Sequence, residues 1–321
     1  MKPKRIVVIG GGSGSYNILK GLKPYSKKGL IKLTVIVAMT DSGGSSGQIR
    51  DEFGILPPGD VRRCLVALSD ETELVKKLFQ HRFESKGSLK DHSFGNLFIT
   101  GLTQILGSEE KAIKEAQKIL KVYGNVVPVT FDDSHLKATL ENGDILLGES
   151  KIDLPRNNST KKIVNLELTP NAKANKEALN EIKQADWIIL GPGDLYTSII
   201  ANLLIQGISK TIVNSKAKKV YNCNIMTKNG ETNNYTVADH LNEIEKYLGK
   251  KCIDYVTYND KNIPQELITK YAKENAKPVE IRITDSKKPG YIGANLLTKK
   301  DIARHDPKKI GKLLNKIFFK K

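Results

Sequence analysis

Cysteine, tryptophan and long apolar runs are scarce in this 321-residue chain. The three cysteines, Cys64, Cys223 and Cys252, are far apart and show no pairing that is typical of a disulfide framework or a zinc site. We therefore expect buried thiols and a reducing, cytoplasmic setting. No apolar run approaches the roughly 20 residues that span a bilayer. The first run stops after Ile9, which is too early for a signal peptide.

Acidic residues are also in deficit, with 35 Asp and Glu against 52 Lys and Arg and a formal net charge of +17. Binding of nucleic acid is one interpretation, and a surface enriched in solvated lysine is the other. Lysine is spread along the whole chain, and aromatic residues make up only 6% of it, so the stacking surface of a single-strand binder is missing. We favour the solvated surface and expect neither a nucleic-acid nor a membrane partner.

Glycine-rich turns that follow short apolar runs are what the sequence does contain. They span residues 10–14, 41–47 and 191–194, and each follows a run that is typical of a buried strand. Glycine lets an anion approach backbone N–H groups because no Cβ is in the way. Three such turns predict a shared anionic ligand. A plain strand-to-helix turn remains the alternative for the first and third turns, and a solvent-exposed linker for the second. Ser15 stands where a dinucleotide fingerprint has its third glycine.

Hydrophobic periodicity predicts an α/β fold with a mainly parallel sheet. Strands at 5–9 and 33–38 flank a helix at 15–23, which Pro24 should stop. Asp60 is expected to cap a helix, and Gly124 to end another at 109–122. Residues 126–169 read as an antiparallel meander with an Asn-Gly turn. Residues 1–70 and 185–321 would form the core, and 71–184 an inserted helical and β segment. Further helices are expected at 71–80, 94–106, 173–184, 238–248, 264–274 and 307–318, and further strands at 187–190, 211–213, 219–223 and 253–257.

Several of these segments together resemble one known family. Four segments are similar to the bacterial gluconeogenesis factors. They are the turn at 10–14, the stretch from Asp41-Ser42-Gly43-Gly44 to Pro57-Pro58-Gly59-Asp60, the segment His92-Ser93-Phe94-Gly95-Asn96, and residues 190–198. Those proteins belong to the 2-phospho-L-lactate transferase (CofD-like) superfamily. Residues 221–227 and Arg304-His305-Asp306-Pro307 extend the resemblance over nearly the whole chain.

The resemblance implies a Rossmann-like three-layer αβα core. It also implies a cytosolic protein that binds nucleotide sugars of the UDP-N-acetylglucosamine type. Such a protein would support cell shape and cell-wall precursor supply during gluconeogenic growth, and no reaction is assigned to that branch. The transferase branch moves a phospholactyl group from a guanosine diphosphate donor onto a deazaflavin with Mg²⁺. A Mg²⁺-dependent transferase that uses a nucleotide diphosphate donor is therefore the alternative.

The sequence departs from the family pattern at three positions. Thr40 stands where the family has the first of two adjacent acids. Asp41 alone is therefore left as a candidate metal ligand. Asp41 could instead bind a ribose hydroxyl. Ser13 and Ser15 replace threonine and leucine in the first turn, and Ser13 keeps the hydroxyl.

The motifs and the resemblance together predict a set of ligand-binding residues. No catalytic residue is assigned, and a homo-oligomer is compatible with the sequence. The alternative for His92 is a structural histidine that bonds to the backbone. The alternative for Arg304 is a charged surface residue without a ligand. The predicted residues are Gly11, Gly12, Ser13, Gly14, Asp41, Gly43, Gly44, Ser45, Ser46, His92, Asn96, Gly191, Gly193, Asp194, Tyr196, Thr197, Asn224, Thr227 and Arg304.

Overall fold

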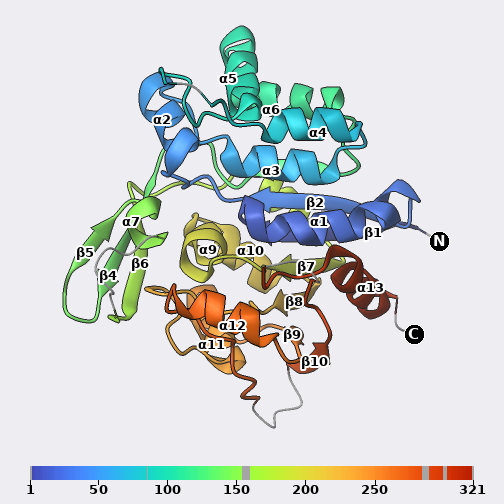
Figure 1. Ribbon diagram of the computed structural model, residues 1–321. Helices are drawn as coiled ribbons and strands as arrows, with labels where there is room; N and C mark the ends of the chain where they lie inside the picture. Colours follow the sequence, from blue (N-terminus) through green and yellow to red (C-terminus); the bar gives the residue numbers. More distant parts are fainter. Residues whose placement is uncertain (1, 85, 154–159, 284–288, 299–301, 320–321) are drawn as a thin grey trace.

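A seven-stranded parallel sheet forms the centre of the molecule (Figure 1). The computed structural model describes residues 2–84, 86–153, 160–283, 289–298 and 302–319. An inner strand carries Ile6, Val7, Val8 and Ile9, which are all buried, as expected for a parallel strand covered on both faces. The strands, in spatial order, are β10 (Gly290–Ala294), β9 (Tyr255–Asn259), β8 (Lys218–Asn222), β7 (Trp187–Leu190), β1 (Lys4–Gly10), β2 (Ile31–Val37) and β3 (Asn125–Pro128).

The order of the strands reverses at β1. From β1 the chain adds β2 and β3 on one side, and β7 to β10 follow on the other. Because parallel crossovers are right-handed, opposite directions of travel place their helices on opposite faces of the sheet. On one face, α1 (Gly12–Lys27) packs against α3 (Gly59–Leu68) and α13 (Pro307–Phe318). Helices α8 (Lys176–Gln184) and α10 (Ile208–Asn214) pack together on the other. The three-layer α/β prediction is confirmed.

The remaining helices connect or flank the strands of the sheet. None of the helices among the described residues is long and apolar enough to cross a membrane. The helices are α2 (Gly44–Phe53), α4 (Glu73–Gln80), α5 (Phe94–Leu106), α6 (Glu109–Ile119), the π-helix η1 (Leu195–Ile200), α9 (Ala201–Leu204), α11 (Val237–Leu248) and α12 (Gln265–Ala272).

A separate antiparallel sheet stands at one side of the molecule (Figure 1). It contains β4 (His135–Leu140), β5 (Ile145–Leu147) and β6 (Ile163–Thr169), with α7 (Glu149–Asp153) after β5. The meander prediction was wrong at its start, because β3 pairs with β2 in parallel. Val126 and Val127 are buried in succession, which is typical of a parallel strand covered on both faces rather than an alternating antiparallel one. Strand β3 thus joins the main sheet although it lies within the segment 71–184.

Two predicted signals at helix ends were also wrong. Pro24 does not stop α1, which continues to Lys27. Pro24 has no N–H to bond the Lys20 carbonyl, but both residues are exposed, so solvent can take the place of that bond. Asp60 is not an N-cap, because α3 begins at Gly59 after Pro58. The Asp60 carboxylate turns instead toward Gly12 at the start of α1.

Near the two edges of the sheet, other details differ from the prediction. Gly124 does not cap α6, which ends at Ile119; it has a φ of +154° and lies close to the Leu33 carbonyl. Residues 211–213 lie within helix α10, and the buried Ile208 and Ile212 show helical spacing. Helix α2 and strand β10 were not predicted.

Candidate functional site

A pocket of about 520 Å³ opens at the carboxyl ends of the central strands. Ser13 and Gly14 follow β1, Thr40 and Asp41 follow β2, and Gly193 follows β7. The pocket therefore lies at the point where the strand order reverses, which is where ligands bind in open α/β sheets.

Most of the predicted binding residues meet in this one pocket. All three glycine turns contribute to its lining, together with the loop after β8 and the segment before α13. The predicted residues that line it are Ser13, Gly14, Asp41, Gly43, Gly44, Ser45, Ser46, Asn96, Gly193, Asp194, Thr197, Asn224 and Arg304.

Three of the predicted glycines support the pocket from behind. A Cβ at Gly11 would lie 2.5 Å from the Ser198 Oγ, and one at Gly12 would lie 2.6 Å from an Asp60 carboxylate oxygen. Gly191 has a φ of +67°, and its Cβ would lie 2.8 Å from Ile199. These glycines allow the loops to pack closely, and they are not part of the lining.

The other three predicted residues lie behind the lining as well. The Tyr196 hydroxyl hydrogen-bonds that of Tyr235 at 2.9 Å, deep in the core. The Thr227 Oγ1 accepts from the Lys277 N–H at 2.9 Å. His92 is buried with its Nδ1 3.2 Å from the Ser45 Oγ, so it positions a residue of the lining.

Close backbone contacts hold the glycine turns against one another. A Cβ at Gly14 would lie 1.9 Å from the Pro192 carbonyl oxygen, and one at Gly59 would lie 2.2 Å from the Ser46 Oγ. The loop after β7 is fixed further by Asn224, whose Oδ1 accepts from the Gly193 N–H at 3.2 Å and whose Nδ2 donates to the Gly193 carbonyl at 2.9 Å.

Helices α1 and α2 both begin at the pocket, and neither has a side-chain cap. In α4, α5, α6, α8, α11 and α13 the side chain of the N-cap residue accepts a hydrogen bond from the first turn. The N-caps of α1 and α2 are Gly11 and Gly43, which offer none. The Gly12 N–H of α1 donates to the Asp60 carboxylate, and the positive end of the helix dipole favours negative charge at the start of both helices.

Sequence reasoning missed several charged residues of the pocket. Asp60 was identified only as a helix cap, and Glu149 comes from α7 beside the antiparallel sheet, so no local pattern connects it to the glycine turns. The charged lining residues that were not predicted are Asp60, Arg62, Arg63, Arg82, Glu149 and Asp153.

Three carboxylates lie near one another on one side of the pocket. Burial, together with repulsion from Asp41, raises the pKa of Asp60 to about 6. Burial and repulsion from Asp41 and Asp153 also raise the pKa of Glu149 to about 8. The Asp41 Oδ1 accepts from the Gly43 N–H at 3.0 Å, and a Glu149 oxygen lies 3.3 Å from the Ser42 N–H. This side of the pocket therefore favours a proton or a cation.

The arginines of the pocket differ in their bonding. Arg63 forms an ion pair with Asp60 at 3.1 Å. Arg62 donates to Asn96 at 2.8 Å and to the Phe79 carbonyl at 3.2 Å, and burial lowers its pKa to about 10. Arg304 is exposed, and within the described parts of the chain no hydrogen bond or ion pair holds its guanidinium. Arg82 donates one bond, to the Asp91 carbonyl. Arg304 is thus the lining arginine whose donors are all left for a ligand by the described residues.

Three buried polar atoms in residues of the lining have no hydrogen-bond partner among the described residues. They are Thr40 Oγ1, Thr197 Oγ1 and His305 Nε2, and each side chain belongs to a residue that is at most 5% exposed. Buried polar groups are nearly always hydrogen-bonded, so each of these three atoms needs a partner that the described residues do not supply.

Comparison with known proteins identifies the family of this chain. Residues 6–296 match the family described as 2-phospho-L-lactate transferase CofD. Proteins named gluconeogenesis factor are similar over nearly the full length. The one from Halalkalibacterium halodurans is 42% identical, with 98% of this chain and 96% of that protein covered. The one from Bacillus subtilis is 42% identical, with 98% and 97% covered.

A solved structure shows the same fold. The crystal structure of a Bacillus halodurans protein superposes with a TM-score of 0.92 at 42% identity, covering 98% of this chain and all of that chain. The sequence match, the relatives and the shared fold agree with the resemblance that the motifs gave. This chain belongs to the CofD family and, within it, is similar to the gluconeogenesis factors.

Proposed function

We propose that this chain is a gluconeogenesis factor that binds a nucleotide sugar of the UDP-N-acetylglucosamine type. The observation that carries the proposal is the meeting of three glycine turns and two helix N-termini with glycine N-caps in one polar pocket. Backbone N–H groups arranged in this way suit the negative charge of a diphosphate.

The two ends of the ligand would have different partners. Arg304 offers a planar fork to a phosphate oxygen pair. Tyr271 lines the pocket beside Ala303 and Arg304, and its hydroxyl accepts from the Ala303 N–H at 3.2 Å. Its ring would stack on a nucleobase. Asp41, with carboxylate oxygens facing the pocket, would accept from sugar or ribose hydroxyls when it does not hold a metal.

A Mg²⁺ ion that the diphosphate brings would find carboxylates in this pocket. Mg²⁺ prefers carboxylate oxygens, phosphates and water. Asp41, Asp60 and Glu149 supply such oxygens, and the raised pKa values of the last two indicate repulsion that a cation would relieve. Mg²⁺ there would offset the charge of the diphosphate. The loss of an acid at Thr40 is thus offset by carboxylates from α3 and α7.

We also propose that the protein acts in the cytoplasm and supports cell shape and cell-wall precursor supply on gluconeogenic carbon. The similarity to gluconeogenesis factors supports this role. A strain without the gene should grow on glucose and lose its normal shape on a gluconeogenic carbon source. Restoration of shape by the wild-type gene, but not by an Arg304→Ala allele, is the expected result. Restoration by both alleles would contradict the link between the pocket and the role.

Ligand binding is tested by thermal unfolding with UDP-N-acetylglucosamine, UDP and GDP. A ligand at 100 times its Kd stabilises the folded state by about 2.7 kcal/mol, so the melting temperature should rise. Arg304→Ala should weaken binding about tenfold or more, because hydrogen bonds to charged groups contribute about 1.5–3 kcal/mol. Arg282→Ala is the matched control, because Arg282 is exposed and pairs with Glu280. No shift with any of the nucleotides at millimolar concentration would refute the proposal.

The second candidate is a Mg²⁺-dependent transferase that uses a nucleotide diphosphate donor. The carboxylates of Asp41, Asp60 and Glu149 favour it, because the transferase branch of the family uses a metal. The expected result is release of nucleoside monophosphate from a labelled donor by the wild type, and its loss in Asp41→Asn. If the protein binds the nucleotide but turns over no donor with any candidate acceptor, the first proposal, a nucleotide-sugar-binding gluconeogenesis factor, is favoured.

A further inference from the structure

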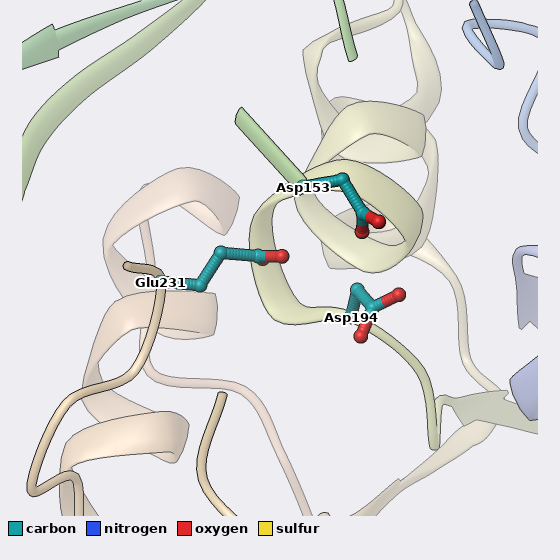
Figure 2. A group of neighbouring side chains, drawn as sticks. All are labelled: Asp153, Asp194 and Glu231. Carbon is teal, nitrogen blue, oxygen red and sulfur yellow. The ribbon is translucent and has the colours of Figure 1, made fainter. Parts of the chain in front are cut away.

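A second group of carboxylates lies apart from Asp41. Figure 2 shows Asp153, Asp194 and Glu231 directed toward a common space. One oxygen from each lies within 4.8 Å of the other two, which is close enough for a shared cation. Asp153 ends α7, Asp194 precedes η1, and Glu231 lies in the loop after β8. The group therefore joins three segments that are distant in the sequence.

A lysine already occupies the position that a metal ion would take. The Lys228 Nζ lies 3.2 Å from Asp194 and 3.1 Å from Glu231, and it also pairs with Asp153. An ammonium group has three donors, which matches three carboxylates. The other Glu231 oxygen accepts from the Tyr196 N–H at 3.1 Å.

Burial makes this pairing strong. The Glu231 side chain is fully buried, and that burial raises its pKa to about 7. Burial alone would lower the pKa of Lys228, but attraction to Glu231, Asp194 and Asp153 outweighs it and raises the pKa. Removing one partner from a buried ion pair leaves an uncompensated charge, so the carboxylates without Lys228 would need another cation.

We infer that Lys228 is an internal cation that replaces a metal ion among Asp153, Asp194 and Glu231. Asp153 and Asp194 line the pocket, so the lysine neutralises the carboxylates beside the loop after β7. It also ties α7, and with it Glu149, to the core. Any metal that accompanies the ligand is therefore confined to the side of Asp41, a consequence that rests on the proposed function.

The test counts bound Mn²⁺ by electron paramagnetic resonance on the full chain without nucleotide. Lys228→Ala should bind one more ion per chain than the wild type, and adding Asp153→Asn should remove that ion. Lys228→Arg is the matched control, because it keeps the charge and should bind as the wild type does. Circular dichroism checks that each variant is folded.

Two results would overturn the inference. One is a folded Lys228→Ala variant that gains no ion. The other is a wild-type protein that loses a Mn²⁺ ion on Asp153→Asn, because the cluster would then hold a metal beside the lysine. The comparison of the wild type with Asp153→Asn needs no Lys228 variant, so it tests the inference even if Lys228→Ala does not fold. Failure of the proposed function shows separately, as a missing nucleotide-induced shift in melting temperature.

Discussion

Single glycines determine how closely the loops of the pocket approach each other. Gly14 is the clearest case, because its Cα faces the backbone of the loop after β7, with the Pro192 carbonyl oxygen only 1.9 Å from the position of a Cβ. Backbone atoms cannot rotate away as a flexible side chain can. A Cβ there must separate the loops that follow β1 and β7.

Gly14→Ala should therefore destabilise the fold by about 1–3 kcal/mol, the usual effect of overpacking, and weaken nucleotide binding. Gly101→Ala is the control: Gly101 is also helical, and nothing lies within 4 Å of its Cβ position. It should be neutral or stabilising by up to about 1 kcal/mol. Urea unfolding of both variants checks this, and equal effects would refute the steric account.

A buried histidine gives the protein a pH dependence. Burial lowers the pKa of His240 to about 4, although a bond to the Thr236 carbonyl opposes the shift. The folded pKa lies below the unfolded value of about 6.5, so the unfolded state binds the proton more readily. Stability falls as the pH drops from 6.5 toward 4, by about 2 kcal/mol for this group at pH 5. His240→Gln should reduce the stability lost between pH 7 and pH 5, and the exposed His81→Gln should not.

Glu149 should act in the opposite direction. Its folded pKa of about 8 lies above the unfolded value, so its charged form opposes folding above pH 4.5. Glu149→Gln should raise the free energy of unfolding by more than about 1 kcal/mol at pH 8, and by less at pH 5. The exposed Glu110→Gln is the control. A destabilised Glu149→Gln variant at pH 8 would show that the carboxylate is not under repulsion.

At the scale of elements, local pattern predicted most of the helices and strands but not every connection. The helices at 94–106 and 307–318 and the strand at 187–190 agree with the structure residue for residue. Each carries a strong apolar period or run, often with a cap such as Ser93 or Asp306. The segment 211–213 was interpreted as a strand because three residues are too few to distinguish the hydrophobic period of a helix from that of a strand.

Helix α2 was missed because its first half is glycine and serine, which favour loops. The residues were recognised as a site, but the helix that presents their N–H groups was not. Strand β10 contains two glycines and no fully buried residue, so it lacks the apolar run of the other strands. In both cases the tertiary environment, rather than local propensity, determines the element.

The contact between α1 and α13 depends on two glycines. A Cβ at Gly311 would lie 2.4 Å from the Gly21 carbonyl oxygen, and one at Gly21 would lie 2.2 Å from the Pro307 carbonyl oxygen. Alanine would gain helix propensity at either position, so a loss of stability must come from packing.

Gly311→Ala should lower the free energy of unfolding by about 1–3 kcal/mol, because backbone contacts cannot adjust. Lys312→Ala on the exposed side of the same helix is the matched control and should be nearly neutral. Denaturant unfolding of both checks the packing; a stabilising Gly311→Ala would indicate that α13 is free to move outward.

At the scale of the whole molecule, the pocket depends on topology that no local pattern reveals. The three glycine turns could be predicted to meet, because carboxyl ends of parallel strands share one edge of the sheet. The contribution of Glu149 and Asp153 could not, because it requires that α7 pack against η1. The contact of Asp60 with Gly12 likewise requires that α3 pack on α1.

The central claim is that the backbone of the three glycine turns, with the starts of α1 and α2, forms one cradle for a diphosphate. Amide hydrogen exchange with and without UDP-N-acetylglucosamine tests it most directly. The account predicts slower exchange in segments 12–15, 43–47 and 193–198 together, and a weaker effect in Arg304→Ala. Protection confined to one of these segments, or found only elsewhere in the chain, would contradict it.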